Sequence, residues 1–346
     1  RPANRNALRE LGSLVGNQGN PAEAETLLRE ALRQGEGDTE ASRNLVRALL
    51  QQQDYDAAAT EARRMAAAGE PTGVADFQLG LALEGQGSLD EAATAYRSAL
   101  DKSPLADEPL LRLVRLYLRD GQAAEAETYL LQHLREQPDH VRAQLLLAEV
   151  YSVQARTGDS SALYRKMIAR DPGLVAAYIG LAALADDTDG RIAPLQDGFA
   201  VNPQSSELAL ALGASYSKQG RYAQAIAVYE RAIEARDNDL IATNLAALLL
   251  DQRDDAASHE QALQLAERFA NGEQHPFNHG VLGWALHKNG DSLRAVRYLE
   301  QAVAAAPDVA QLHYYLGMAY LAMGNEVNAR QSLGRSVELA ERNGSP

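Results

Sequence analysis

The sequence predicts an all-α solenoid of about ten helix–turn–helix repeats. Three recurring marks lead to this prediction: a leucine or similar residue followed by a small one, an alanine with a large apolar residue at fixed distances after it, and a glycine between the two apolar segments. Within each segment the apolar residues recur at i, i+3 and i+4, which indicates helices and not strands. The marks recur about every 34 residues. A repeat of this length indicates a stacked array in which neighbouring units bury each other's apolar faces.

The first mark begins at Leu11-Gly12 and returns every 34 residues as far as Ala148, and the same spacing separates Gly283 from Gly317. We expect the leucine and the small residue to share one face of a first helix. The small residue then lets the second helix of the pair approach closely. The copies read LGSLV, LVRAL, LGLAL, LVRLY, LAEVY, IGLAA, LGASY, LAALL, LGWAL and LGMAY in chain order.

The other marks lie at fixed distances from the small residue. Twelve residues on comes an alanine in most copies, and four further on comes a large apolar residue or tyrosine, as in Leu28, Tyr96, Tyr229, Leu299 and Leu333. The glycine between the two segments permits a tight turn, because glycine adopts positive φ without steric cost. These turn glycines are Gly19, Gly87, Gly121, Gly220 and Gly290.

The spacing divides the chain into three parts. Residues 1–172 form a regular array of five repeats, residues 173–205 form a shortened and irregular repeat where a bend is expected, and residues 206–346 form an array of four repeats. The irregular part is indicated by the 32 residues from Ala148 to Gly180 and by a segment, LADDTDGRIAPLQDGFAVNPQ, without the usual second-helix alanine. Simple drift of one repeat is the alternative, because a solenoid tolerates local change.

The combination of Leu282, Gly283, Ala295, Leu299 and Pro307 resembles the 34-residue pattern of the tetratricopeptide repeat family. His279 stands where that family has an early aromatic residue. The resemblance covers nearly the whole chain, which is similar to a long bacterial array of such repeats. It implies a right-handed superhelix in which the first helices line a concave groove.

Composition limits the function classes. The chain has 33 Lys+Arg against 47 Asp+Glu, a net charge of −14, which argues against a nucleic-acid partner because phosphates would be repelled. No apolar run reaches transmembrane length, so no membrane insertion is expected. Cysteine is absent. Arginine outnumbers lysine and alanine is abundant, which favours a bacterial source, and the ends of the sequence suggest a piece of a longer protein.

Three stretches suggest chemistry but have simpler interpretations. His275 and His279 are four residues apart, as in helical metal pairs, but Pro276 separates them and no further ligand lies nearby. The stretch DDTDG fails the calcium-loop pattern and is interpreted as a polar turn. LGSLVGNQGN has no Lys-Ser/Thr and follows no strand, so a nucleotide loop is not expected. We therefore expect no catalytic, cofactor-binding or metal-ligating residues and no enzyme activity.

The family resemblance also implies which positions face the groove: six and three residues before the small residue, then one, four and five after it. These positions place arginines in the first half of the chain and apolar or aromatic side chains in the last two repeats. The predicted partner-binding residues are Arg43, Arg47, Arg115, Arg119, Arg142, Phe277, Trp284, His287, Tyr314 and Met318. Of these, Trp284 is the one that the repeat pattern does not require.

The predicted function is a non-catalytic scaffold that binds a protein or peptide partner in its groove and assembles a multi-protein complex. A basic stretch would receive acidic groups, and an apolar patch a hydrophobic element. The acidic groups could instead belong to an anionic polysaccharide. The alternatives are the periplasmic part of a bacterial exopolysaccharide exporter, which would favour the periplasm, and the regulatory arm of a larger enzyme. The simpler interpretation is that each arginine pairs with an inner glutamate and that Trp284 packs against a neighbouring repeat.

Overall fold

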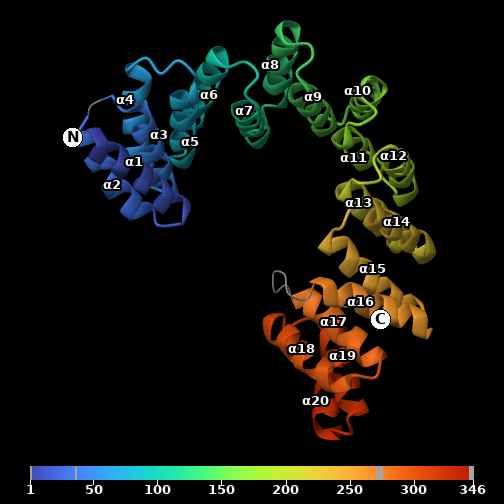
Figure 1. The fold of residues 1–346 in the computed structure, drawn as a ribbon. Coiled ribbons are helices and arrows are strands. Elements are labelled where there is room, and N and C mark those ends of the chain that lie inside the picture. Colours follow the sequence, from blue (N-terminus) through green and yellow to red (C-terminus); the bar gives the residue numbers. More distant parts are fainter. Residues whose placement is uncertain (1, 36, 270–275, 343–346) are drawn as a thin grey trace. The chain divides into compact units, whose positions relative to one another are not determined.

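The computed structural model describes residues 2–35, 37–269 and 276–342. Within these ranges it contains twenty α-helices and no strand, so the predicted all-α array of helix pairs is confirmed (Figure 1). The first helices of the pairs are α1 (Pro2–Asn17), α3 (Thr39–Gln51), α5 (Val74–Gly85), α7 (Asp107–Arg119), α9 (Val141–Val153), α11 (Val175–Ala183), α13 (Ser206–Lys218), α15 (Asp239–Gln252), α17 (Pro276–Lys288) and α19 (Ala310–Ala322). The second helices are α2 (Pro21–Arg33), α4 (Tyr55–Ala67), α6 (Leu89–Lys102), α8 (Ala123–Glu136), α10 (Thr157–Arg170), α12 (Thr188–Val201), α14 (Tyr222–Ala235), α16 (Ala256–Phe269), α18 (Ser292–Ala305) and α20 (Glu326–Arg342).

In eight of the ten pairs the turn is made by a residue with positive φ, seven positions after the small residue. Asp187 and Arg253, at that position in the pairs α11–α12 and α15–α16, have φ of −114° and −129° instead. All five predicted turn glycines have φ between 70° and 87°. In two of the repeats without a turn glycine, Gln53 and Ala155 adopt the same left-handed conformation at φ 59°. The turn geometry is therefore a property of the repeat, and two non-glycine residues accept its steric cost.

Close approach within a pair depends on the missing side chain of the small residue. A Cβ added to Gly80 would lie 2.4 Å from Cε1 of Tyr96, and one added to Gly283 would lie 2.5 Å from Cγ of Leu299. Both large side chains are fully buried. The large residue of the second helix thus occupies the volume that a first-helix side chain would need.

Contacts divide the chain into two compact units, Arg1–Tyr164 and Arg165–Pro346. In unit 1 the buried side chains form two clusters, one around Leu28 and Leu45 and one around Tyr96 and Leu113. In unit 2 they form one cluster that begins at Tyr178. Each cluster joins helices of successive repeats, as expected for an array that buries its core between neighbours.

The segment 173–205 contains the shortest described helix, α11, with nine residues. Its close contact is reversed: Gly198 lies on the second helix, and a Cβ there would meet the ring of Tyr178 on the first helix at 2.7 Å. Pro194 lies inside α12. The two compact units divide inside α10 and not at residue 172, and the bend predicted over 173–205 stays a prediction.

No helix among the described residues combines the length and the apolar character needed to cross a bilayer.

Replacing Gly80 by alanine should destabilise unit 1 by about 1–3 kcal/mol, because the new methyl group would overlap the buried ring of Tyr96. The midpoint of urea unfolding, followed by circular dichroism, measures the effect. Gly158→Ala in α10 is the matched control, since a Cβ at Gly158 meets nothing within 4 Å and alanine is the better helix former. Equal shifts of the two midpoints would contradict the packing account.

Candidate functional site

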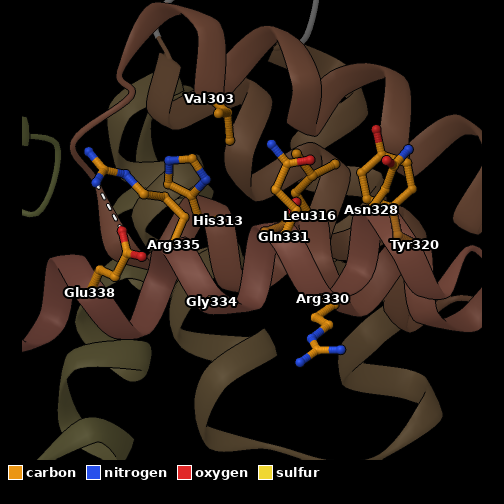
Figure 2. A pocket seen from close by; sticks show the side chains of 11 residues that line it. Val303, His313, Leu316, Tyr320, Asn328, Arg330, Gln331, Gly334, Arg335 and Glu338 are labelled. Atoms are coloured by element: carbon orange, nitrogen blue, oxygen red, sulfur yellow. Dashed lines mark hydrogen bonds and ion pairs between the residues drawn. The ribbon is translucent and has the colours of Figure 1, made fainter.

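A cleft of about 750 Å³ lies between the helices α18, α19 and α20 of the last two repeats. His313, Leu316 and Tyr320 of α19 form its floor, and residues of α18 and α20 form its walls. Figure 2 shows the ion pair of Arg335 with Glu338 at one end of the cleft and Arg330 on the opposite side of its helix.

This cleft follows from the repeat architecture. The next two clefts, of about 550 and 440 Å³, occupy the equivalent places between α12, α13 and α14 and between α4, α5 and α6. Three similar clefts on three different repeats indicate a general gap between successive second helices. The described lining of the cleft of the last two repeats therefore does not distinguish it as a binding site.

The first-helix face of unit 1 is the surface around Arg43, Arg47, Phe77, Arg115 and Arg119 on α3, α5 and α7. The simpler interpretation, in which each arginine pairs with an acid, holds for part of this face. Arg119 donates to Oε1 of Glu84 at 3.2 Å, and Arg142 on α9 lies 3.9 Å from Oδ2 of Asp107. These two predicted binding residues are thus already engaged.

The other three arginines of the predicted site are not engaged in this way, although the charge of Arg43 acts on the buried Glu70. Arg43, Arg47 and Arg115 make no ion pair within the described residues, and the side chains of Arg47 and Arg115 are exposed. By contrast, Arg9 lies within 3.6 Å of Glu10, Asp38 and Glu40, and its hydrogen bond with Glu10 raises its pKa. Charge pairing on this face is therefore selective.

Arg112 was missed by the sequence analysis. It lies 3.9 Å from Glu84 and 3.3 Å from Glu108, beside Arg119. Its position, two residues before the small Val114, was not among the offsets used to predict the groove. The same offset leads to Tyr315 in unit 2, so one further position in the repeat would have found both residues.

A shallow polar notch of only about 10 Å³ lies between α1 and α3 on the same face. Apart from small residues it is lined by Ser13, Asn17, Asn44, Arg47 and Gln51. None of these side chains has a hydrogen-bond partner within the described ranges, and all of them are at least partly exposed. The notch thus presents donors and acceptors that the fold itself does not use.

In unit 2, Trp284 is the centre of an aromatic stack. Its ring lies 4.4 Å from that of Tyr315 at an interplanar angle of 9°, and 5.0 Å from that of His287 at 20°. Tyr314 packs against it at a tilt. The tryptophan is 7% exposed, so the expectation that it offers an accessible contact surface is wrong. It packs against the neighbouring repeat, as the simpler interpretation holds.

The stack is tied to a third repeat by a hydrogen bond. The hydroxyl of Tyr315 on α19 donates to Oδ1 of Asp251 on α15 at 3.2 Å, past the intervening α17. Desolvation raises the pKa of Asp251, although the bond from Tyr315 and the charge of Lys288 oppose it. Nε1 of Trp284 is buried without an acceptor among the described residues. Tyr315 and Asp251 are not among the partner-binding residues predicted from the sequence.

We call the apolar surface the large side chains at the groove positions of the last two repeats: Phe277 on α17 and Tyr314, Met318 and Leu321 on α19. Phe277 is 37% exposed, Tyr314 43% and Leu321 50%, while Met318 is half-buried. His287 is half-buried and meets Oγ of Ser292 at 3.1 Å. Lys288 pairs with Asp254 at 3.1 Å. Of the residues predicted for unit 2, three lie on this surface with Leu321, and Trp284 and His287 support it.

The stretches that suggested chemistry have structural roles. His279 is buried and packs against the ring of Tyr298 at 5.7 Å, whereas His275 lies outside the described residues. In DDTDG, Asp187 caps α12 by accepting a hydrogen bond from the backbone N–H of Gly190 at 2.6 Å. No group of three or more potential metal ligands occurs in the described part of the chain.

Comparisons with protein families show the nature of the repeat. Models described as tetratricopeptide repeat match residues 83–150, residues 9–73 and 281–346, and residues 208–256, which together make up more than half of the chain.

Two curated relatives share parts of the sequence. The protein O-mannosyl-transferase TMTC2 of Homo sapiens is 29% identical over 99 residues, which are 28% of this chain and 12% of that protein. The TPR repeat-containing protein YpiA of Bacillus subtilis is 24% identical over 244 residues, 68% of this chain and 56% of that protein. The chain thus spans less than two thirds of either relative.

The solved structures that are similar to this chain have low TM-scores. YrrB, described as a TPR protein with an unusual peptide-binding site, has a TM-score of 0.41 and 18% identity, and the match covers 51% of this chain and 91% of that one. A tetratricopeptide repeat protein from Parabacteroides merdae has a TM-score of 0.41 and 15% identity, with coverage of 92% and 99%.

Because Trp284 is the only tryptophan, its fluorescence should report burial directly. We expect emission at short wavelength and weak quenching by acrylamide. The reference is a Trp284→Phe, Tyr314→Trp variant, which places the indole at an exposed position of the same stack and should be quenched several times more strongly. Similar quenching of the two proteins would show that Trp284 is accessible after all.

The stability of unit 2 should fall as the pH is lowered below about 6.5, the ordinary pKa of histidine. Burial, and then the charge of Lys288, lowers the pKa of His287 in the folded chain. The unfolded chain therefore takes up a proton first, which favours unfolding. Urea midpoints followed by Trp284 fluorescence at about pH 7.5 and about pH 5 measure the loss. It should be smaller in His287→Gln, and an equal loss in both proteins would refute the assignment.

Proposed function

The chain belongs to the tetratricopeptide repeat family, and we propose that it is a non-catalytic scaffold that binds a segment of a partner protein on its first helices and so helps to assemble a multi-protein complex. The observation that carries the proposal is the apolar surface of α17 and α19. Large apolar side chains that a monomer leaves exposed together are typical of interaction sites.

The apolar surface is suited to binding because its base is rigid. The rings of Trp284 and Tyr315 lie nearly parallel beneath it, and the hydrogen bond from Tyr315 to Asp251 fixes the stack to α15. Preorganised aromatic side chains lose little conformational entropy when a partner covers them. An amphipathic helix or an extended apolar segment would bury Tyr314, Met318 and Leu321 together.

Trp284 supports this surface from below instead of contacting the partner. Removing it would disturb the packing of three repeats, so its substitution cannot separate binding from folding. Tyr314 and Leu321 are the better probes, because about half of each side chain is already in solvent.

Two other roles were considered from the sequence: part of a polysaccharide exporter and the regulatory arm of an enzyme. Among the described residues no contact or charge arrangement in unit 2 favours either role over a protein partner. The apolar character of the surface supports the scaffold, because a hydrophobic side chain contributes more to protein recognition than to binding a charged polymer.

The double substitution Tyr314→Ala, Leu321→Ala should reduce recovery of partner proteins from a native lysate about tenfold, because it removes the exposed anchors. Quantitative mass spectrometry of the co-purified proteins measures recovery. The control is Leu293→Ala, which removes a side chain that is 72% exposed on the second helix α18 and should leave recovery unchanged. Equal recovery with all three proteins would remove the apolar surface from the proposal.

A further inference from the structure

The arginines of unit 1 that make no ion pair follow a pattern along the first-helix face. Arg43 and Arg47 lie one turn apart on α3, and Arg115 lies on α7. The helix between them, α5, places Phe77 and Leu81 at the corresponding repeat positions, and both are half-buried. The order across the three helices is therefore cationic, apolar, cationic.

Glu84, an acidic residue of α5, is engaged by partners other than Arg47 and Arg115. Glu84 of α5 accepts hydrogen bonds from the hydroxyl of Tyr96 at 2.7 Å and from Arg119 at 3.2 Å. Its carboxylate is thus held by two donors, on α6 and α7. In a chain of net charge −14, arginines that make no ion pair are the ones available to acidic groups from outside.

The notch between α1 and α3 extends the cationic end of this face. Asn17, Asn44 and Gln51 present amide groups beside Arg47 without partners of their own in the described part of unit 1. Side-chain amides can both donate to and accept from a peptide backbone. An extended segment that places a carboxylate on Arg47 would find backbone partners there.

We propose that unit 1 binds an extended segment of a partner protein in which two acidic residues flank an apolar one. This inference rests on the proposed scaffold function and names the chemistry of a second contact. One carboxylate binds Arg47 and Arg43, the apolar side chain packs on Phe77 and Leu81, and the other carboxylate binds Arg115.

Geometry sets the spacing of the segment. Packed helices lie about 8–10 Å apart. A segment in the extended polyproline II conformation advances about 3.1 Å per residue with three residues per turn, so side chains three positions apart point to the same side. Crossing from one first helix to the next therefore takes about three residues. The segment has an acidic residue, an apolar residue about three positions later and an acidic residue about three positions after that.

The test uses short peptides that are acetylated and amidated at their ends, so that only side chains carry charge. One peptide has aspartate at positions 2 and 8 and leucine at position 5; the other has the same composition with the two aspartates adjacent. Fluorescence anisotropy at low salt measures both affinities. We expect the spaced peptide to bind about tenfold more tightly, and Arg47→Glu and Arg115→Glu each to weaken it about tenfold.

Arg33→Glu is the matched control: this arginine lies on the second helix α2, its side chain is 72% exposed, and its reversal should leave the affinity unchanged. Thermal unfolding of each variant confirms that it is folded. Equal binding of the two peptides, or equal loss in all three variants, overturns the proposal. So does arginine-dependent binding of an oligogalacturonate in the absence of peptide binding, which would assign the face to an anionic polysaccharide. Each of these results leaves the test of the apolar surface in unit 2 unaffected.

Discussion

In most pairs, the contact between the small residue of the first helix and the large side chain sixteen residues later determines the rest of this structure. Where Gly80 has no side chain, the ring of Tyr96 fills the space, and the two helices of the pair pack at close range. The pair then has one fixed rotation, because turning either helix would drive the ring into the backbone. All other positions of the first helix follow from that rotation, including those that face away from the second helix.

Because the rotation of the pair is fixed, the first helices can carry charged side chains in unit 1 and aromatic side chains in unit 2 at the same repeat position. The position directly after the small residue is Arg47 in α3, Arg115 in α7 and Trp284 in α17. In unit 1 it holds charges that the fold does not neutralise, whereas in unit 2 it holds a ring on which other rings stack. Because the core contact is made elsewhere on the helix, these positions can differ between repeats without altering the pair.

The repeat pattern was sufficient to predict the helix pairs, the turn glycines and the small-to-large contacts, since each depends on residues close in sequence. The accessibility of the site residues was not predictable in the same way. Whether Trp284 is exposed depends on Tyr315, which lies in the next repeat, and whether Arg119 is engaged depends on Glu84, one repeat earlier. A periodic pattern assigns a side chain to a face, but neighbouring repeats decide what covers it. The reversed contact of Gly198 with Tyr178 shows the same limit, because the pattern expects the small residue on the first helix.

An array whose repeats touch only their nearest neighbours behaves as a chain of independent links, which can open one at a time. The hydrogen bond from Tyr315 to Asp251 skips one link and joins α19 to α15 directly. Three successive repeats of unit 2 therefore share a constraint that none of them contains alone. Fraying at the end of α19 costs a contact on α15, so disorder introduced at one end of this group is felt two repeats away. A structural change in one of these repeats therefore affects more than its nearest neighbour. The shape of the apolar surface depends on three repeats together.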